Sequence, residues 1–129
     1  MIDPYTTVRA FLAADASLVA LTGSRLYAAR DVPPPGYDPN DGQAITFRVR
    51  GGTRDYDDAL LIPSVQFKCY GNTEITAYQC YRALVDALHN GHNATINHAE
   101  EETFGQSLEE PDTEWHFVLC FFTIMLRTS

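Results

Sequence analysis

The final apolar stretch, Trp115–Arg127, has the strongest hydrophobic pattern in the chain and reads WHFVLCFFTIMLR. It is too short to cross a bilayer as a helix, which needs about 20 residues. A strand with one wet face would alternate apolar and polar residues, but this stretch is apolar at both sets of alternate positions. One set is Trp115, Phe117, Leu119, Phe121 and Met125, and the other is Val118, Cys120, Phe122, Ile124 and Leu126. We therefore expect a strand covered by helices on one face and by more of the chain, or by a second copy, on the other.

Three helices are predicted upstream of this strand. Asp3 followed by Pro4 is a helix start, because the carboxylate caps free amides and proline fits the first helical position. That helix should end near Ala14, and Asp15 should cap a short second helix that Gly23 closes. The longest helix should begin after Asn72 or Thr73 and reach about His89, with one apolar stripe. Its stripe comprises Ala77, Tyr78, Tyr81, Leu84, Val85 and Leu88.

Four further segments have the composition of strands. Residues 25–29 form a short one, and 44–50 alternate cleanly, with Ile45, Phe47 and Val49 inward. Residues 60–70 form another, in which Pro63 indicates an edge position or an irregular entry. We expect one more strand within 93–104, followed by a polar, acidic connection, QSLEEPDTE.

Two segments are predicted to be loops. Residues 31–43, DVPPPGYDPNDGQ, are too rich in Pro, Gly, Asp and Asn for a regular element. Residues 51–59 are glycine-containing and highly charged. Both exceed the usual connection length, which often marks binding loops. Four residues of the first are candidates for an exposed binding loop: Pro33, Pro34, Pro35 and Tyr37.

Taken together, this order of elements predicts an α+β fold in one domain over residues 1–129. We expect a mostly antiparallel sheet of about four strands with helices packed on one face.

Composition narrows the possible partners. The chain has 9 Lys plus Arg against 17 Asp plus Glu, a formal net charge of −8. Tight binding to duplex phosphates needs the opposite balance. The cysteines Cys69, Cys80 and Cys120 form no CxxC pair, so we expect reduced thiols. The N-terminus lacks a secretion signal, so we expect synthesis and residence in a cytoplasm.

Two stretches together resemble the tail terminator family of long-tailed bacteriophages, also called tail-completion or tail-to-head joining proteins. The first is LAADASLVALTGSRLY (12–27), which leads into the prolines at 33–35. The second is VQFKCYGNTEITAYQCYRALVDAL (65–88), a strand that runs through Asn-Thr into a helix. The similarity extends over nearly the whole chain.

The resemblance implies a structural virion protein with no cofactor. It implies a ring, usually of six copies, on the head-proximal end of the tail tube. Such a ring would end polymerisation of the tube protein and offer the head connector a docking surface. Genomic DNA would pass through its lumen without specific binding, which suits an acidic ring, and no membrane is involved.

Several sets of residues could instead carry chemistry. His89, His92 and His98 lack the spacing of a metal site. Asp55, Asp57 and Asp58 lack the glycine and glutamate of a calcium loop. The acidic residues between 100 and 114 could pair for acid-base work, but no nucleophile accompanies them. We therefore predict no metal and no catalytic residue.

The remaining candidates are contact residues for another subunit or the tail tube. Arg48, Arg50 and Arg54 form the main basic cluster, and Arg is favoured for forked ion pairs. The full candidate set is Arg48, Arg50, Arg54, Asp55, Asp57, Asp58, Phe121 and Phe122.

Two alternatives remain open. One is a head-completion or neck protein on the connector side. The other is a small enzyme or ligand-binding domain with an unrecognised site, although GxSxG, HExxH and Walker-type motifs are absent.

Overall fold

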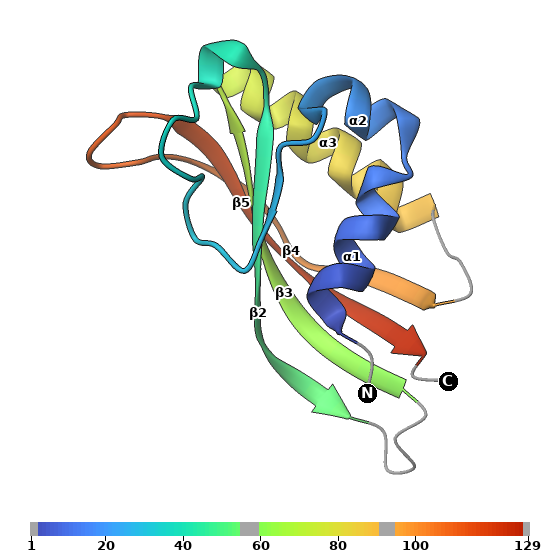
Figure 1. The fold of residues 1–129 in the computed structure, drawn as a ribbon. Helices are drawn as coiled ribbons and strands as arrows, with labels where there is room; N and C mark the ends of the chain where they lie inside the picture. Colours follow the sequence, from blue (N-terminus) through green and yellow to red (C-terminus); the bar gives the residue numbers. More distant parts are fainter. Residues whose placement is uncertain (1–2, 55–59, 91–94, 128–129) are drawn as a thin grey trace.

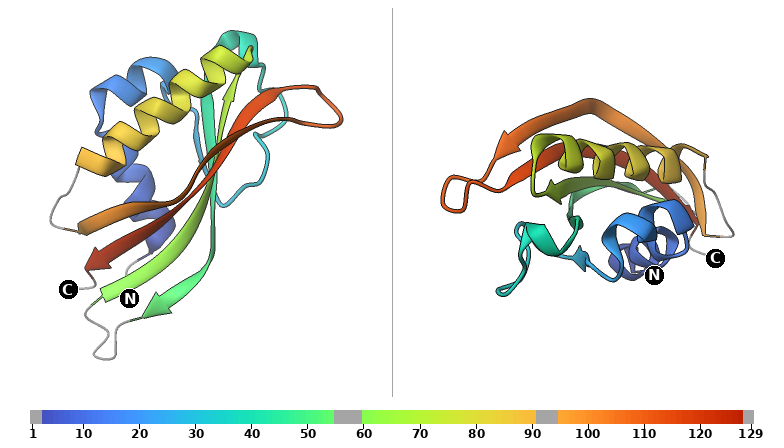
Figure 2. Two further views of the ribbon diagram at one scale, coloured as in Figure 1. Left: turned by 180° about the vertical axis from the view of Figure 1, so that it is seen from behind. Right: turned by 90° about the horizontal axis from the view of Figure 1, so that it is seen from above.

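The computed structural model describes residues 3–54, 60–90 and 95–127. In these residues a five-stranded sheet carries three α-helices on one face (Figure 1), which confirms the α+β prediction and adds a strand. Figure 2 shows the helical layer from behind and from above. The elements are α1 (Pro4–Ala13), α2 (Ala16–Thr22), β1 (Leu26–Ala28), the 3₁₀ turn η1 (Pro39–Asp41), β2 (Ala44–Arg54), β3 (Leu60–Gly71), α3 (Glu74–Asn90), β4 (Ile96–Glu109) and β5 (His116–Arg127).

The helix caps form as the sequence predicts. The Asp3 carboxylate accepts from the Tyr5 amide at 3.0 Å, and Asp15 accepts from the Leu18 amide at 2.9 Å. Gly23 ends α2 with a φ of 56°, a left-handed conformation that favours glycine. Thr73 precedes α3, and its hydroxyl accepts from the Thr76 amide at 3.2 Å. Local capping chemistry therefore sets the helix boundaries.

The strands lie in the order β1-β2-β3-β5-β4. β1 pairs with β2 in parallel, and every other pair is antiparallel. The apolar β5 thus lies between β3 and β4, and β4 forms one edge. At the other edge, β1 pairs only with the residues from Ile45 to Phe47, so the second half of β2 has β3 as its sole strand partner among the described residues.

The β2–β3 hairpin differs from the prediction. β2 continues through Gly51 and Gly52 to Arg54, with a register shift between Val49 and Gly52. Gly52 has a φ of 135° and lies opposite Pro63. The predicted edge position of Pro63 is wrong because β3 is central, whereas its irregular entry is confirmed. The rest of the predicted second loop, residues 55–59, lies outside the described residues.

The predicted acidic connection before β5 is also wrong, because β4 runs on to Glu109 and turns into β5 within residues 110–115. As an edge strand β4 has mostly polar side chains where it meets water, with Phe104 as the exception. Three register shifts also break its two-residue alternation. The predicted strand within 93–104 is therefore confirmed, and the bulges concealed only its continuation to Glu109.

The proline-rich loop contains one short regular element that the sequence did not predict. Asp38 caps the 3₁₀ turn η1 by accepting from the Asn40 amide at 2.9 Å. Tyr37 donates its hydroxyl to the Gly42 carbonyl at 2.7 Å. The loop is therefore held by its own hydrogen bonds, and Figure 1 shows it on the side of the sheet away from the helices.

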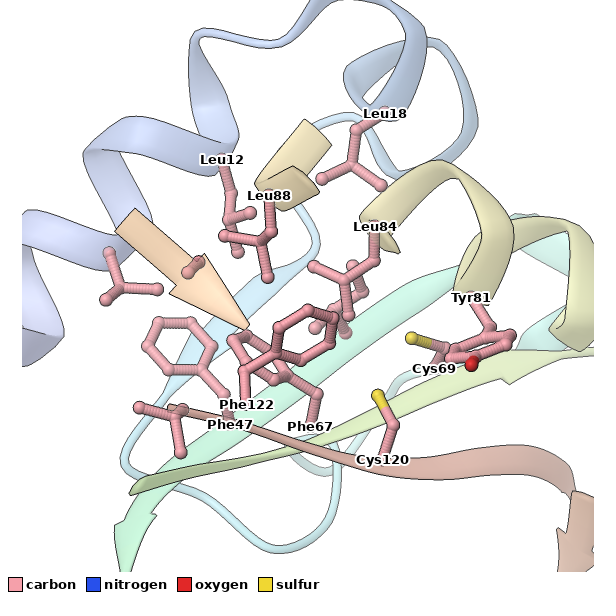
Figure 3. Close-up of a cluster of buried hydrophobic side chains, with 14 of the residues drawn as sticks. Leu12, Leu18, Phe47, Phe67, Cys69, Tyr81, Leu84, Leu88, Cys120 and Phe122 are labelled. Carbon is pink, nitrogen blue, oxygen red and sulfur yellow. The ribbon is translucent and has the colours of Figure 1, made fainter. Parts of the chain in front are cut away.

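The main core lies between the sheet and the helices (Figure 3). Phe47, Phe67 and Phe122 come from three adjacent strands, and their ring centroids follow one another at 5.6 and 5.7 Å. Leu84 and Leu88 of α3 pack against them and are at most 1% exposed. The predicted inward faces of β2 and β3 are thus confirmed.

Gly105 allows α3 to approach β4 closely. A Cβ atom at Gly105 would lie 2.6 Å from Cζ of Tyr81 and 2.7 Å from Cγ1 of Val118. We expect Gly105→Ala to displace the Tyr81 ring and to lower the free energy of unfolding by about 1–3 kcal/mol. Urea denaturation measures this loss. The matched control is Gln106→Ala, at an exposed neighbour, which should change stability by less than about 0.5 kcal/mol; equal effects would contradict the packing role.

Candidate assembly surfaces

The two faces of β5 have different surroundings. Toward the helices, its side chains are at most 1% exposed: Val118, Cys120, Phe122, Ile124 and Leu126. On the helix-free face, Phe117 is buried, whereas Leu119, Phe121 and Met125 are only half-buried. The helices therefore bury one face of β5. The other face is covered by other parts of the molecule and only partly buried.

Part of that cover comes from aromatic rings of the same chain. Tyr37 in the proline-rich loop meets Trp115 edge-on, with ring centroids 5.4 Å apart. The centroid of the Tyr70 ring lies 6.4 Å from that of Trp115 and 5.4 Å from that of Phe117. This second, smaller cluster also buries Ala44 completely. The expectation that more of the chain could cover the second face is thus met at this end of the sheet.

Long cationic side chains cover the middle of the same face. The Arg50 guanidinium lies 4.0 Å from the centroid of the Phe121 ring. Arg50 donates to the Ser64 hydroxyl at 3.1 Å, and Ser64 donates to Glu102 at 2.6 Å. Arg50 also pairs with Glu102 at 3.4 Å. This network spans the sheet from β2 to β4, and it keeps the Phe121 ring half-buried without a partner protein.

A second network joins the middle of the sheet to the β4–β5 turn. Lys68 lies 4.9 Å from the Phe117 ring centroid and 3.5 Å from the Glu110 carboxylate. Tyr70 donates its hydroxyl to the same carboxylate at 2.5 Å. Burial raises the pKa of Tyr70, and its hydrogen bond to Glu110 raises it further. The phenol therefore stays protonated and acts as a donor at neutral pH.

The structure separates the predicted contact residues into three groups. Arg48, Arg50 and Phe121 share the helix-free face, and Arg48 pairs with Asp31 at 2.6 Å. Phe122 is 1% exposed in the core, so we remove it from the candidate surface, because adjacent strand residues point to opposite faces. The side chain of Arg54 and all of residues 55–59 lie outside the described part of the chain. Three of the predicted contact residues fall in that segment: Asp55, Asp57 and Asp58.

The predicted proline loop is only partly exposed. Pro33 is buried and Tyr37 is half-buried, whereas Pro35 and the neighbouring Val32 are exposed. A mostly apolar pocket of about 360 Å³ lies between this loop and the β4–β5 turn, beside Trp115. Pro33 and Tyr37 therefore pack within the protein. The exposed part of the loop includes Val32 and Pro35.

Sequence reasoning missed three polar residues that shape the helix-free face: Ser64, Lys68 and Glu102. The alternation of β3 places Ser64 and Lys68 on the face opposite to the core-facing Val65, Phe67 and Cys69. This much was visible in the sequence. Their contacts with β2 and β4 were not visible, because they depend on which strands lie between.

Across 3–54, 60–90 and 95–127, no three His, Cys, Asp or Glu side chains gather in a way that could hold a metal ion. Within the same ranges, no helix has the length and apolar content that crossing a membrane requires.

Comparisons with known proteins show a fold likeness. No protein-family model matches the sequence, and no curated protein matches it either. A solved structure described as the virion of a native gene transfer agent particle contains a similar chain. The match has a TM-score of 0.63 and 20% sequence identity, and it covers 93% of this chain and 91% of that chain. The two chains therefore share a fold along almost their entire lengths.

Proposed function

We propose that this chain is a structural virion protein of a phage-like particle and that it acts as a tail terminator. Copies of it, six by the family resemblance, close into a ring on the head-proximal end of the tail tube. The ring ends polymerisation of the tube protein and provides the docking surface for the head connector. The role is structural and involves no catalysis and no cofactor.

The observation that carries this proposal is the end-to-end likeness to a chain of a gene transfer agent virion, 93% of one chain against 91% of the other. The resemblance of residues 12–27 and 65–88 to tail terminators narrows the role from virion component to ring.

The charge of the chain supports a conduit for DNA. The formal net charge is −8, so a ring of six copies would be strongly acidic. Such a ring repels phosphates and lets DNA pass without holding it. The exposed part of the proline-rich loop and the helix-free face remain our proposed surfaces for the tube protein and the connector.

Deleting the gene from the particle that encodes it tests this function. In electron micrographs we expect overlong tails or tails without heads, because nothing would end tube growth or join the tube to the connector. Supplying the gene on a plasmid should restore tails of normal length, which controls for effects on neighbouring genes. Normal free tails beside empty or leaking heads would show a head-completion protein instead, and intact particles at normal titre would overturn a virion role.

A further inference from the structure

Phe104 is an exposed aromatic side chain on the β4 edge of the sheet. It is 74% exposed, a value that only Ile75 matches among the large hydrophobic residues of the described chain. Its ring packs edge-on against Tyr81, with centroids 5.9 Å apart. The Tyr81 hydroxyl accepts from the Gly105 amide at 2.9 Å and donates to Glu101 at 2.6 Å. The hydrogen bonds of Tyr81 therefore hold the ring against which Phe104 packs, while the Phe104 side chain itself stays exposed.

An apolar pocket lies at the opposite edge of the sheet, on β2. Its volume is about 380 Å³, and it lies on the half of β2 that β1 does not reach. It is lined by the apolar residues Pro4, Val49, Leu61 and Pro63 and by the segment from Gly51 to Thr53. Pockets of this size bury an aromatic ring well.

The strands at the two edges differ in the sign of their charged residues, and part of that charge is paired within one subunit: Arg48 with Asp31 and Arg50 with Glu102. β1 and β2 together contain three Arg and no acidic residue: Arg48, Arg50 and Arg54. β4 contains four Glu and no Lys or Arg: Glu100, Glu101, Glu102 and Glu109. Opposite potentials on two surfaces steer their encounter and fix its orientation.

We propose that the occupant of this pocket is Phe104 of a second copy of the chain. The acidic β4 edge of one copy then faces the basic β2 edge of the next, and the aromatic ring anchors the contact. The two surfaces differ, so the contact is head-to-tail, and its repetition gives a closed ring or a filament. This inference deepens the proposed tail-terminator ring by assigning its subunit contact.

Side-chain insertion fits the β4 edge better than addition of a strand does. The three register shifts of β4 interrupt the regular row of amides and carbonyls that a new strand would need. On β2, the Val49 amide already donates to the Tyr5 hydroxyl at 3.0 Å. Both edges thus lack a continuous backbone surface, whereas each has one apolar feature that fits the other.

Disulfide crosslinking between two variants tests the contact. We would mix Thr53→Cys, at a residue that lines the pocket, with Phe104→Cys carrying an affinity tag, and oxidise the mixture with oxidised glutathione. The native Cys69, Cys80 and Cys120 are fully buried, so only the introduced thiols are accessible in the folded protein. We expect at least tenfold more mixed dimer than from the matched control, Thr53→Cys with Ile75→Cys, whose introduced cysteine replaces an equally exposed side chain.

A mixed-dimer yield no greater than that of the control, at protein concentrations up to 1 mM and with tail tubes present or absent, would overturn the proposal. The double variant Thr53→Cys/Phe104→Cys adds a second readout. It should give a ladder of covalent oligomers that stops at the ring number. A ladder without a stop would show a filament and overturn ring closure at this contact.

The outcome is separable from that of the gene deletion. Overlong tails in the deletion strain together with failed crosslinking would support the tail-terminator function and reject this subunit contact. The ring would then have to form through another surface. Efficient crosslinking together with normal particles in the deletion strain would retain the contact and reject the tail function.

Discussion

Replacing Phe122 with alanine should lower the free energy of unfolding by about 3–5 kcal/mol, as expected for a fully buried phenylalanine. The side chain is 1% exposed and meets the Phe67 ring edge-on at 5.7 Å, in the part of the core that α3 covers. Neither the sheet nor the helix can close the resulting cavity without losing other contacts. Urea denaturation followed by circular dichroism measures the loss.

The matched control is Phe121→Ala, the same substitution one residue earlier on the opposite face. Phe121 is half-buried, and much of its cover is the Arg50 guanidinium at 4.0 Å. The loss should be smaller, about 1–2 kcal/mol, from partial burial and the cation–π contact. Equal losses at the two positions would mean that the helix-free face packs as tightly as the main core.

The three cysteines of the native protein should react with iodoacetamide at least about 10³-fold more slowly than those of the unfolded chain. Cys69, Cys80 and Cys120 are all 0% exposed and lie together between α3 and the sheet. Burial raises the pKa of the Cys69 thiol well above its usual value, with further contributions from Cys80 and Cys120 beside it. Thiolate formation is suppressed along with access of the reagent, since the thiolate is the nucleophile.

Mass spectrometry of protein quenched at successive times follows the reaction, and a sample in 8 M urea provides the unprotected rate. All three thiols should become reactive together, because exposing any of them requires separating α3 from the sheet. Rapid modification of one cysteine in native protein would show that its surroundings open locally and would contradict a single rigid core.

The surroundings of β5 bear directly on assembly. The sequence predicts two apolar faces, and a second copy is one possible cover for the second face. The chain itself provides much of this cover through Tyr37, Tyr70, Arg50 and Lys68. Phe104 and the pocket beside Val49 lie at the two edges of the sheet, away from this face. For this reason our proposed subunit contact uses the edges.

Local interactions made much of the fold predictable. The caps at Asp3, Asp15 and Gly23 depend on atoms within four residues, so the sequence by itself determined where α1 and α2 begin and end. The alternation in β2 and β3 likewise determined which side chains enter the core. Prediction missed the second half of β4, where register shifts break the alternation, and the end of β2 at Gly51–Gly52, where the strand passes through glycines.

The candidate surfaces were less predictable. The sequence singled out Arg50 and Phe121 as separate candidates, and the fold places one above the other. It also grouped Phe121 with Phe122, which the strand divides between two faces. Neither Phe104 nor the pocket around Val49 has a signature in the sequence, since an exposed phenylalanine and a half-buried valine are unremarkable in isolation.

The sequence by itself thus determined the helices, most strands, the core-facing residues and the acidic character of the protein. Only the tertiary structure decided that β5 lies between β3 and β4, that β4 is an edge, and that Arg50 of β2 meets Glu102 of β4 across the helix-free face. The physical reason is range. Caps and alternation arise from neighbours along the chain. Strand order and edge exposure arise from pairing between distant segments, such as Leu60 with Arg127, which no local pattern encodes.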